Sequence, residues 1–315
     1  MLIPSAHVLK HISIEQAIAA VEQAILRLDA GHVGAPVSLG VTVADGTFHV
    51  KACASKPPDA AGIFVAKINA NFPGNPAAGR PTIQGVIAVF DTRTGDVRAI
   101  VDSPSITGLR TAATTGVVIR HLAPRELRVA TIVGCGVLGR FHMQALEACG
   151  IARFYLFDSE PERAQALAQW GRDSLGVDCE AVDMMRRATL MSQVIITCTP
   201  SRQPFLGLDD VRPGTLVAAV GADNENKSEI EPDLLARARV VTDLTAQCMK
   251  GGDLHHSPLS AVCGELTDVV AGRLARTGPD EIVVFDSTGL AVQDLALCEL
   301  LLPPISSTEP IGSQQ

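Results

Sequence analysis

Aromatic side chains and positive charge are both in short supply in this sequence. Aromatic residues make up 3% of the 315 residues, and Trp170 is the single tryptophan, so a folded core must be mainly aliphatic. The 26 Lys and Arg residues are outnumbered by 34 Asp and Glu residues, which gives a formal net charge of −8. Nucleic acids and anionic membrane surfaces attract basic proteins, so neither is an expected partner.

The sequence also lacks the patterns of disulfide frameworks, metal sites and membrane segments. Its eight cysteines contain no CxxC pair, which in a chain of this length indicates reduced cysteines of a cytoplasmic protein. The adjacent His255 and His256 do not favour a metal site, because neighbouring side chains point apart. No run approaches 18 apolar residues, and residues 1–13 lack the basic start and apolar core of a signal peptide. We therefore expect a cytoplasmic protein without a membrane span or a metal.

What the sequence does contain is enough apolar material for two cores. Hydrophobic residues account for 47% of the chain and charged residues for 19%, which is typical of compact folded proteins. A length of 315 residues exceeds what one hydrophobic core usually supports. The expected organisation is therefore two domains.

The first part of the chain predicts a helix followed by a sheet. Ser13 and Gln16 have the spacing of a capping box, apolar residues follow at helical spacing, and Gly31 lies just past the end. From about residue 36 to residue 100, short apolar runs alternate with Gly, Asp and Pro, which predicts a mixed or antiparallel sheet. One of these strands is expected to end at Lys67. Residues 106–123 then read as a helix.

After Arg125, apolar strands alternate with helices, which predicts a Rossmann-type, doubly wound parallel sheet. The helix expected at residues 290–301 falls outside this alternation, so we expect it to return to the first domain. The fold class is thus α/β, with an added mixed α+β domain. The predicted boundaries are 1–120 with 290–315 for the α+β domain and 121–289 for the Rossmann domain.

The strongest motif is a GxGxxG sequence made by Gly134, Gly136 and Gly139, directly after a predicted strand and at the start of a helix. In that context the glycines allow a tight turn, a close backbone approach to a pyrophosphate and close helix packing. The helix N-terminus supplies N–H donors to the phosphates. A plain packing turn is the alternative.

Acidic and hydroxyl side chains follow later strands of the same predicted sheet. Asp158 ends the second strand, where an acid accepts hydrogen bonds from ribose hydroxyls and favours NADH over NADPH, although the nearby Arg163 softens that preference. Thr199 and Ser201 follow another strand and either line the cofactor or belong to an ordinary turn. The predicted cofactor-binding residues are Gly134, Gly136, Val137, Leu138, Gly139, Asp158, Ser159, Arg163, Thr199 and Ser201.

Two cations stand in apolar surroundings: Lys67 after an apolar strand, and Arg110 in an otherwise uncharged helix. Burying a lone cation costs several kcal/mol unless it is paired, so the two residues suggest a shared anion, which a substrate carboxylate would supply. A strand-end lysine that reaches solvent and an exposed helix arginine are the alternatives. Asp223, which follows a buried strand, is a candidate acid or base with a pKa raised by partial burial, or else an ordinary turn residue.

Five sequence blocks together resemble the ornithine cyclodeaminase and mu-crystallin family over nearly the whole chain: "KINANFPGNP", "SITGLRTAA", "GCGVLGRFH", "GADNENKSEI" and "DSTGLAVQD". The resemblance implies a Rossmann domain joined to a substrate-binding and dimerisation domain built from both chain ends, and a homodimer. It also implies roles for individual residues. Lys67 and Arg110 would bind a carboxylate, Asp223 would be the catalytic acid/base, Thr111 would contact a phosphate, and Ser287, Thr288, Gly289 and Gln293 would lie against the nicotinamide.

Departures from the family pattern indicate which reaction to expect. Ser38 replaces an arginine of ornithine cyclodeaminase, and "FHVKA" places His49 and Lys51 where that enzyme has a glutamate that handles the substrate amino group. Lys51 would restore the lost cationic partner for the carboxylate. Within the family, this pattern is most similar to Δ1-pyrroline-2-carboxylate reductases, which reduce a cyclic ketimine to L-proline.

The resemblance therefore implies an NAD(P)H-dependent oxidoreductase that acts on C=N bonds. Its expected catalytic residues are Asp223 and Lys67, and its expected substrate-binding residues are Lys67, Arg110, Lys51, His49 and Gly289. The expected substrates are Δ1-pyrroline-2-carboxylate and its six-membered homologue Δ1-piperideine-2-carboxylate. Ornithine cyclodeaminase with catalytic NAD⁺, an alanine or N-methyl-amino-acid dehydrogenase, and a non-enzymatic crystallin-like binder are the alternatives. The last is disfavoured by the retained charged residues and by the scarcity of aromatics.

Overall fold

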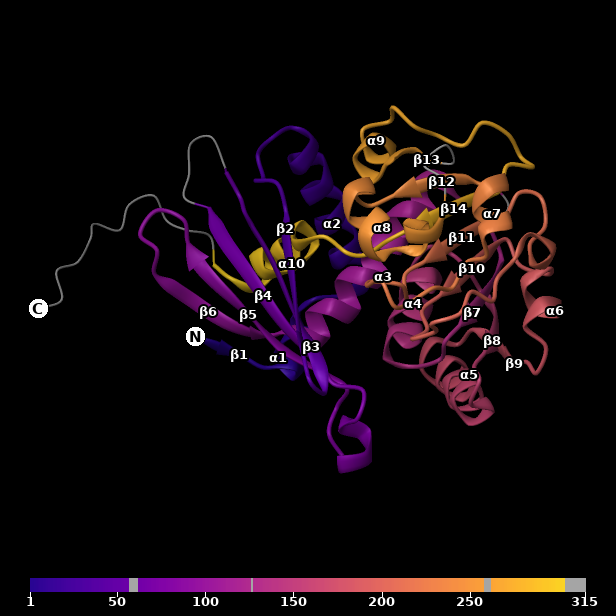
Figure 1. Ribbon diagram of the computed structural model, residues 1–315, viewed down its shortest axis with the longest axis horizontal. Helices are drawn as coiled ribbons and strands as arrows, with labels where there is room; N and C mark the ends of the chain where they lie inside the picture. The colour runs from indigo at the N-terminus through magenta and orange to yellow at the C-terminus, as the bar shows by residue number, and fades with distance from the viewer. Residues whose placement is uncertain (57–61, 126, 258–261, 304–315) are drawn as a thin grey trace, which may run out of the picture. The chain divides into compact units, whose positions relative to one another are not determined.

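The computed structural model describes residues 1–56, 62–125, 127–257 and 262–303 (Figure 1). The chain forms two compact units. Unit 1 contains Met1–Arg110 together with the chain from Leu290 onward, and unit 2 is Thr111–Gly289. The chain crosses between units inside one helix and again before the last one. The predicted domain assignment placed the first crossing later, at 120/121, and stays a prediction.

Unit 1 is built on a six-stranded sheet in the order β1-β6-β5-β4-β3-β2. β1 pairs with β6 in parallel and the other neighbours are antiparallel, so the sheet is mixed, as predicted. The strand expected to end at Lys67 continues to Asn71 instead. The strands are β1 (Leu2–Ile3), β2 (Val37–Val43), β3 (Gly46–Ala54), β4 (Ile63–Asn71), β5 (Ile83–Asp91) and β6 (Val97–Asp102).

Helices cover one face of this sheet. The predicted capping box of Ser13 and Gln16 is present at the start of α2 (Ile14–Asp29), whose buried side begins with Ala17 and Ile18. α10 (Ala291–Leu301) packs against α2, β3 and β4, which is where a helix that returns to the first part of the chain was expected (Figure 1). The remaining helical segments of the unit are α1 (Ser5–His11) and the 3₁₀ turn η1 (Asn75–Ala78).

The two faces of the sheet differ sharply in exposure. Along β4, Val65 and Lys67 are buried on the face toward α10, whereas Ile68 between strands β3 and β5 is 43% exposed on the other face. A row of apolar residues crosses four strands on that other face, because Leu39 pairs with Val50, Val50 with Ile68, and Ile68 with Val86. This exposed apolar face also includes Val37, Val41 and Phe48.

Unit 2 contains an eight-stranded parallel sheet in the order β13-β12-β14-β11-β10-β7-β8-β9. The chain leaves β7 in one direction toward β8 and β9 and later returns to the other side at β10, so the strand order reverses between β7 and β10. In open α/β sheets, ligands bind at the carboxyl ends of the strands at such a reversal. The strands are β7 (Val129–Val133), β8 (Arg153–Phe157), β9 (Asp178–Ala181), β10 (Val194–Thr197), β11 (Leu216–Ala219), β12 (Arg239–Thr242), β13 (Val262–Glu265) and β14 (Val283–Asp286).

Helices pack on this sheet as in a Rossmann fold, which confirms the predicted fold class. Buried apolar side chains such as Ile195, Val217, Val240 and Val284 form a core with Leu234 of α7. The helical segments are α3 (Ser103–Leu122), which contains the first crossing, α4 (Val137–Ala148), α5 (Pro161–Leu175), α6 (Met185–Thr189), η2 (Leu208–Asp210), α7 (Pro232–Arg237), α8 (Thr245–Gly251), η3 (Asp253–His256) and α9 (Leu266–Val270). No helix in the described part of the chain is long and apolar enough to cross a membrane.

Candidate active site

The two predicted carboxylate-binding cations meet around one buried acid in unit 1. Lys67, 3% exposed, donates a 2.8 Å hydrogen bond from Nζ to Asp294 in the first turn of α10. Arg110, 8% exposed, has its Nε 3.7 Å from the same carboxylate. Its Nη1 donates to Oε1 of Gln293 at 3.0 Å. Neither cation reaches solvent, so the alternatives of a solvent-reaching lysine and an exposed arginine do not hold.

Burial governs the protonation of Lys67. Loss of hydration lowers the pKa of the Lys67 ammonium to about 7, Asp294 opposes that shift, and the cations Arg110 and Lys51 reinforce it. A lysine with such a pKa changes charge in the neutral range. In its ammonium form Lys67 can therefore bind a carboxylate, and this binding depends on pH.

The strand register places Lys51 beside Lys67. The two residues are directly opposite each other on β3 and β4, and Ser38 is opposite Lys51 on β2. Like charges directly opposite across a sheet repel, so the pair is costly without an anion nearby. His49 follows on the same face, opposite Asn69, and its Nε2 lies 3.1 Å from Thr47 Oγ1. Lys51 thus lies where it can supplement the cation lost at Ser38.

Asp294 was not among the predicted site residues, although its block was recognised. Its signal in the sequence is an acidic side chain in the run 291–298, whose other residues are apolar except Gln293, and the structure buries it completely. Its carboxylate is the anion that contacts both Lys67 and Arg110. Lys51 lies directly opposite Lys67 on the neighbouring strand, so three cationic side chains gather near Asp294 in unit 1.

The glycine motif in unit 2 has the geometry that a dinucleotide requires. Gly134 has a φ of 101°, which favours glycine, and a Cβ there would lie 2.9 Å from the carbonyl oxygen of Cys198. A Cβ on Gly139 would collide with the carbonyl oxygen of Gly134, whereas a Cβ on Gly136 would meet nothing within 4 Å. Open space therefore adjoins the backbone at the N-terminus of α4, and these residues fit a pyrophosphate there.

Asp158 fastens the glycine motif to the end of β8. Its Oδ2 accepts a hydrogen bond of 2.7 Å from the backbone N–H of Cys135, and its Oδ1 accepts one of 3.0 Å from Glu160. Each carboxylate oxygen has two lone pairs, so acceptor capacity remains for ribose hydroxyls. Arg163 pairs with Glu160 at 2.8 Å on the surface. Ser159 is exposed, and Val137 and Leu138 begin α4 beside the motif.

The hydroxyls predicted after β10 are already engaged within the chain. Thr199 donates from both its backbone N–H and its Oγ1 to the buried carboxylate of Glu229, at 2.6 and 2.7 Å. Ser201 donates from Oγ to the carbonyl oxygen of Gln203 at 2.7 Å. Any contact of these residues with a cofactor must therefore use their remaining atoms. Glu229 was missed at the sequence level, although it lies in the block "GADNENKSEI".

The segment before α10 is held by a second buried acid, Asp243. Its Oδ2 accepts from the backbone N–H of Gly289 at 2.5 Å and from Ser287 Oγ at 2.8 Å. Gln247 donates to Thr288 Oγ1 and to the carbonyl oxygen of Gly289. Thr111, in α3, is 6% exposed. Ser287, Thr288 and Gly289 are therefore held in place by Asp243 and Gln247.

Asp223 differs from its prediction in one respect. The expected partial burial is not observed, because its side chain is 47% exposed and pairs with Lys227 at 2.8 Å. It does lie just after β11, at the carboxyl edge of the sheet, as expected. The chain is buried as far as Ala222, which is 1% exposed, and becomes exposed at residue 223.

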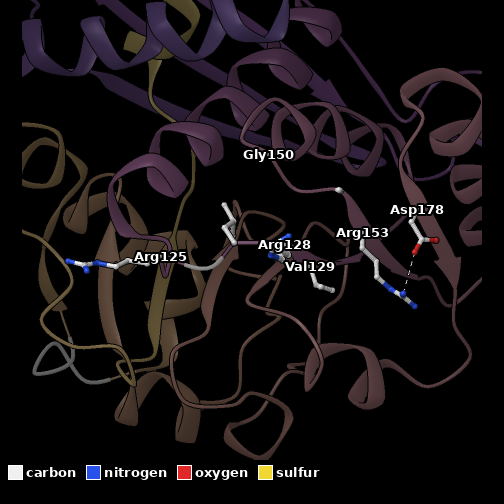
Figure 2. Close-up of a pocket in the computed structure, with 8 residues that line it drawn as sticks. Arg125, Arg128, Val129, Gly150, Arg153 and Asp178 are labelled. Carbon is white, nitrogen blue, oxygen red and sulfur yellow. Dashed lines mark ion pairs between the residues drawn. The ribbon is translucent and has the colours of Figure 1, made fainter.

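A pocket at the opposite edge of the same sheet does not belong to this site. It is lined at the amino ends of β7, β8 and β9 by Val129, Arg153 and Asp178, together with Arg125 and Arg128. Figure 2 shows Arg153 directed toward Asp178 and Arg125 extending away from them, and the Arg153–Asp178 pair measures 3.3 Å. The arginines do not converge on one point, so the pocket lacks the arrangement of an anion site.

Comparison with known sequences decides the family. The sequence model of the ornithine cyclodeaminase/mu-crystallin family matches residues 1–308. The chain belongs to this family. Among curated members, the iminosuccinate reductase of Paracoccus denitrificans (strain Pd 1222) is 34% identical over 244 residues, 75% of each chain. The Δ1-pyrroline-2-carboxylate reductase of the same strain is 33% identical over 248 residues, which cover 76% of this chain and 78% of that relative.

Solved structures of the family have the same fold. The Δ1-pyrroline-2-carboxylate reductase of Thermococcus litoralis, solved with NADH and L-proline, aligns with a TM-score of 0.90 at 26% identity over 96% of each chain. An archaeal alanine dehydrogenase dimer with bound NAD aligns with a TM-score of 0.90 at 28% identity over 96% of this chain and 94% of that one. The predicted family, the Rossmann fold class and the nicotinamide-dependent oxidoreductase class are confirmed.

Proposed function

We propose that the protein reduces Δ1-pyrroline-2-carboxylate to L-proline, and Δ1-piperideine-2-carboxylate to L-pipecolate, with NADH or NADPH as the reductant. The observation that carries this proposal is the buried group of Lys67, Arg110 and Asp294 with Lys51 beside it. A 2-carboxylate attached to the imine carbon is an anion that lysine and arginine side chains bind through charge-assisted hydrogen bonds. The relatives named above, one of them solved with NADH and L-proline, support the same substrate class.

In this proposal the chain's own residues hold the substrate and manage its proton. Lys67 and Arg110 bind the carboxylate and so fix the position of the imine carbon, an orientation effect worth several kcal/mol in favourable cases. A reduced nicotinamide, when bound, supplies the hydride. Asp223 stabilises the protonated imine nitrogen, and in the reverse direction it receives the proton. Its carboxylate also contacts Lys227 Nζ at 2.8 Å.

We further propose that NADH is preferred over NADPH. The support is the carboxylate of Asp158, which is anchored to the glycine motif and has acceptor capacity left for the 2′- and 3′-hydroxyls of the adenosine ribose. A 2′-phosphate at the same place would be repelled. Arg163 pairs with Glu160, which weakens it as a phosphate-binding group.

Iminosuccinate is the second candidate substrate. It carries two carboxylates, and the half-buried Lys51 directly opposite Lys67 supplies a further cation near the first carboxylate site. The 34% identity to a reductase of that name favours it as well. Ornithine is less suited, because His49 and Lys51 stand where the resemblance calls for the glutamate that handles an amino group.

A substrate panel tests these proposals. Purified protein is mixed with NADH or NADPH and with the five-membered imine, the six-membered imine or iminosuccinate, and loss of the reduced nicotinamide is followed by absorbance. The proposal expects the highest kcat/KM with a cyclic imine and NADH. Conversion of ornithine to proline and ammonia with NAD⁺, without net reduction, would instead support cyclodeaminase activity. A clear preference for iminosuccinate would move the assignment to the second candidate.

We also propose that the protein acts as a homodimer in the cytoplasm. All eight cysteines are thiols outside any disulfide, which suits a reducing compartment. The exposed apolar face of the unit 1 sheet, defined above by the row from Leu39 to Val86, is the surface that a second copy would cover. The relative described as an alanine dehydrogenase dimer supports this assembly.

A further inference from the structure

Glu229 is a fully buried acid that joins two strand ends at the carboxyl edge of the unit 2 sheet. Its Oε2 accepts hydrogen bonds from Thr197 Oγ1 at 2.8 Å and from the backbone N–H of Gly221 at 2.9 Å. Its Oε1 accepts from the backbone N–H and the Oγ1 of Thr199, at 2.6 and 2.7 Å. Both oxygens are thus saturated by donors from the ends of β10 and β11. β10 is the neighbour of β7, and the glycine motif follows the end of β7.

The residues around Glu229 fix the position of its carboxylate. A Cβ on Gly221 would lie 2.5 Å from Glu229 Oε1, so only glycine allows the approach. The backbone of Glu229 is itself fixed by Asp253, whose Oδ1 accepts from the N–H groups of Glu229 at 2.6 Å and Ile230 at 2.9 Å. Asp286, at the end of β14, in turn accepts from the backbone N–H of Asp253 at 3.2 Å. A chain of buried acids therefore ties β10, β11 and β14 together at one edge.

The ionised form of Glu229 is the form that holds the segment. Its two oxygens accept from four donors, and protonation removes one of those acceptor positions. The pKa of Glu229 is raised to about 7: burial raises it most and the nearby Asp253 adds to the shift, while the hydrogen bonds from Thr199 and Thr197 oppose it. The other titratable groups nearby are the thiol of Cys198 and Lys227, whose Nζ donates to the carbonyl oxygen of Gly221 at 3.2 Å.

We infer that Glu229 is a positioning residue for the nicotinamide cofactor: by clamping Thr199 to Gly221, it holds the 197–201 segment in the conformation that receives the cofactor. The inference rests on the proposed use of that cofactor. It assigns Glu229 no contact with substrate or cofactor, since its oxygens are already occupied by the chain. Affinity for the cofactor should therefore fall when the clamp is weakened, while affinity for the imine should not.

Glu229→Gln tests this directly. The amide group has nearly the same shape but replaces one acceptor with a donor that faces an N–H or hydroxyl group. The dissociation constant for NADH, followed by nicotinamide fluorescence, should rise about tenfold at pH 8, as expected for the loss of a charge-assisted hydrogen bond. The KM for the imine at saturating NADH should stay within about twofold. In the native protein, NADH should bind more weakly as pH falls through about 7, and in the variant this dependence should be absent.

Glu225→Gln is the matched control, because it makes the same change on an exposed carboxylate four residues earlier. It should bind NADH like the native protein. Equal effects of the two substitutions, or a Glu229→Gln protein with native affinity and native pH dependence, would overturn the inference. Failure of the native protein itself to bind NADH and NADPH would instead refute the proposed function.

A second pair of variants covers the case in which Glu229→Gln does not fold. Thr199→Val keeps the backbone N–H and the side-chain shape but removes the hydroxyl that donates to Glu229, whereas Thr199→Ser keeps the donor. NADH affinity should fall in the valine variant and be restored in the serine variant. Native affinity in a folded Thr199→Val protein would count against the clamp.

Discussion

Lys67 changes charge within the pH range of ordinary assays, so its role can be tested by pH alone. Its folded pKa of about 7 means that the ammonium is present below that pH and is lost above it. A substrate carboxylate binds the ammonium and not the neutral amine, so kcat/KM for the imine should fall as pH rises through about 7. Bound substrate favours the charged form, so kcat should persist to higher pH than kcat/KM. Initial rates at saturating NADH across this range check the expectation.

Lys67→Ala should lower kcat/KM about 10- to 100-fold and remove the fall above pH 7, because it deletes one charge-assisted hydrogen bond to the carboxylate. Lys56→Ala, a change at an exposed lysine shortly after β3, is the control and should leave the profile unaltered. Persistence of the pH dependence in the Lys67→Ala protein would assign it to another group.

Asp294 tunes the same titration. It is the carboxylate that keeps Lys67 charged against the cost of burial, so Asp294→Asn should move the fall in kcat/KM to lower pH. Glu299→Gln is a matched change on the same helix, at a residue that pairs with Arg27, and should not move it. An unshifted profile in the Asp294→Asn protein would mean that the 2.8 Å contact does not control Lys67.

At the scale of residues, the sequence indicated that two cations require an anion but did not indicate which group supplies it. Lys67 and Arg110 in apolar surroundings could be recognised as cations that require an anion. The sequence did not predict that Asp294 supplies this anion. Asp294 is 227 residues away from Lys67, and only the packing of α10 on β4 brings the two together. Glu229 was missed for a related reason: its donors lie at the ends of two strands, β10 and β11, and only the folded sheet brings them to residue 229.

At the scale of elements, substitutions of two glycines at the start of α4 should affect different properties, one the binding of the cofactor and the other the stability of the fold. Gly136 has φ −79° and ψ −155°, which alanine tolerates, and an added Cβ would meet open space. Gly136→Ala should therefore melt near the native temperature but bind NADH at least about tenfold more weakly, since the methyl group occupies the approach to the pyrophosphate. Gly139→Ala should lower the melting temperature, because its Cβ would press on the carbonyl oxygen of Gly134. Calorimetry and NADH titration of both variants check this contrast. Native NADH affinity in Gly136→Ala would refute the assigned cofactor site.

The elements themselves were largely predictable where a local signal exists. The capping box of α2 and the glycine turn before α4 depend on neighbouring residues, and both are present as expected. The extension of β4 past Lys67 to Asn71 was not foreseen, because Lys67, Asn69 and Asn71 interrupt the apolar pattern while the pairing with β3 and β5 continues. Exposure of Asp223 likewise depends on where the chain leaves the core.

At the scale of the whole molecule, the exposed apolar face of unit 1 is the feature that a single chain does not explain. Leu39 and Ile68 are 58% and 43% exposed, and they lie in the same row across the sheet. Apolar surfaces of this kind cost free energy in water and usually mark an interface. β2 is also an edge strand whose outer hydrogen-bonding groups are open to another strand. Both properties favour association of two copies through this sheet.

Charge placed on that face should therefore separate the copies. Leu39→Lys and Ile68→Lys each bury a charge if the face is an interface, so they should convert a dimer to a monomer in sedimentation or light-scattering measurements at one protein concentration. Thr42→Lys is the control, because Thr42 lies on the same strand but points to the opposite face of the sheet. It should leave the native mass unchanged. A native protein that is monomeric, or lysine variants that keep the dimer mass, would show that two copies do not associate through this face.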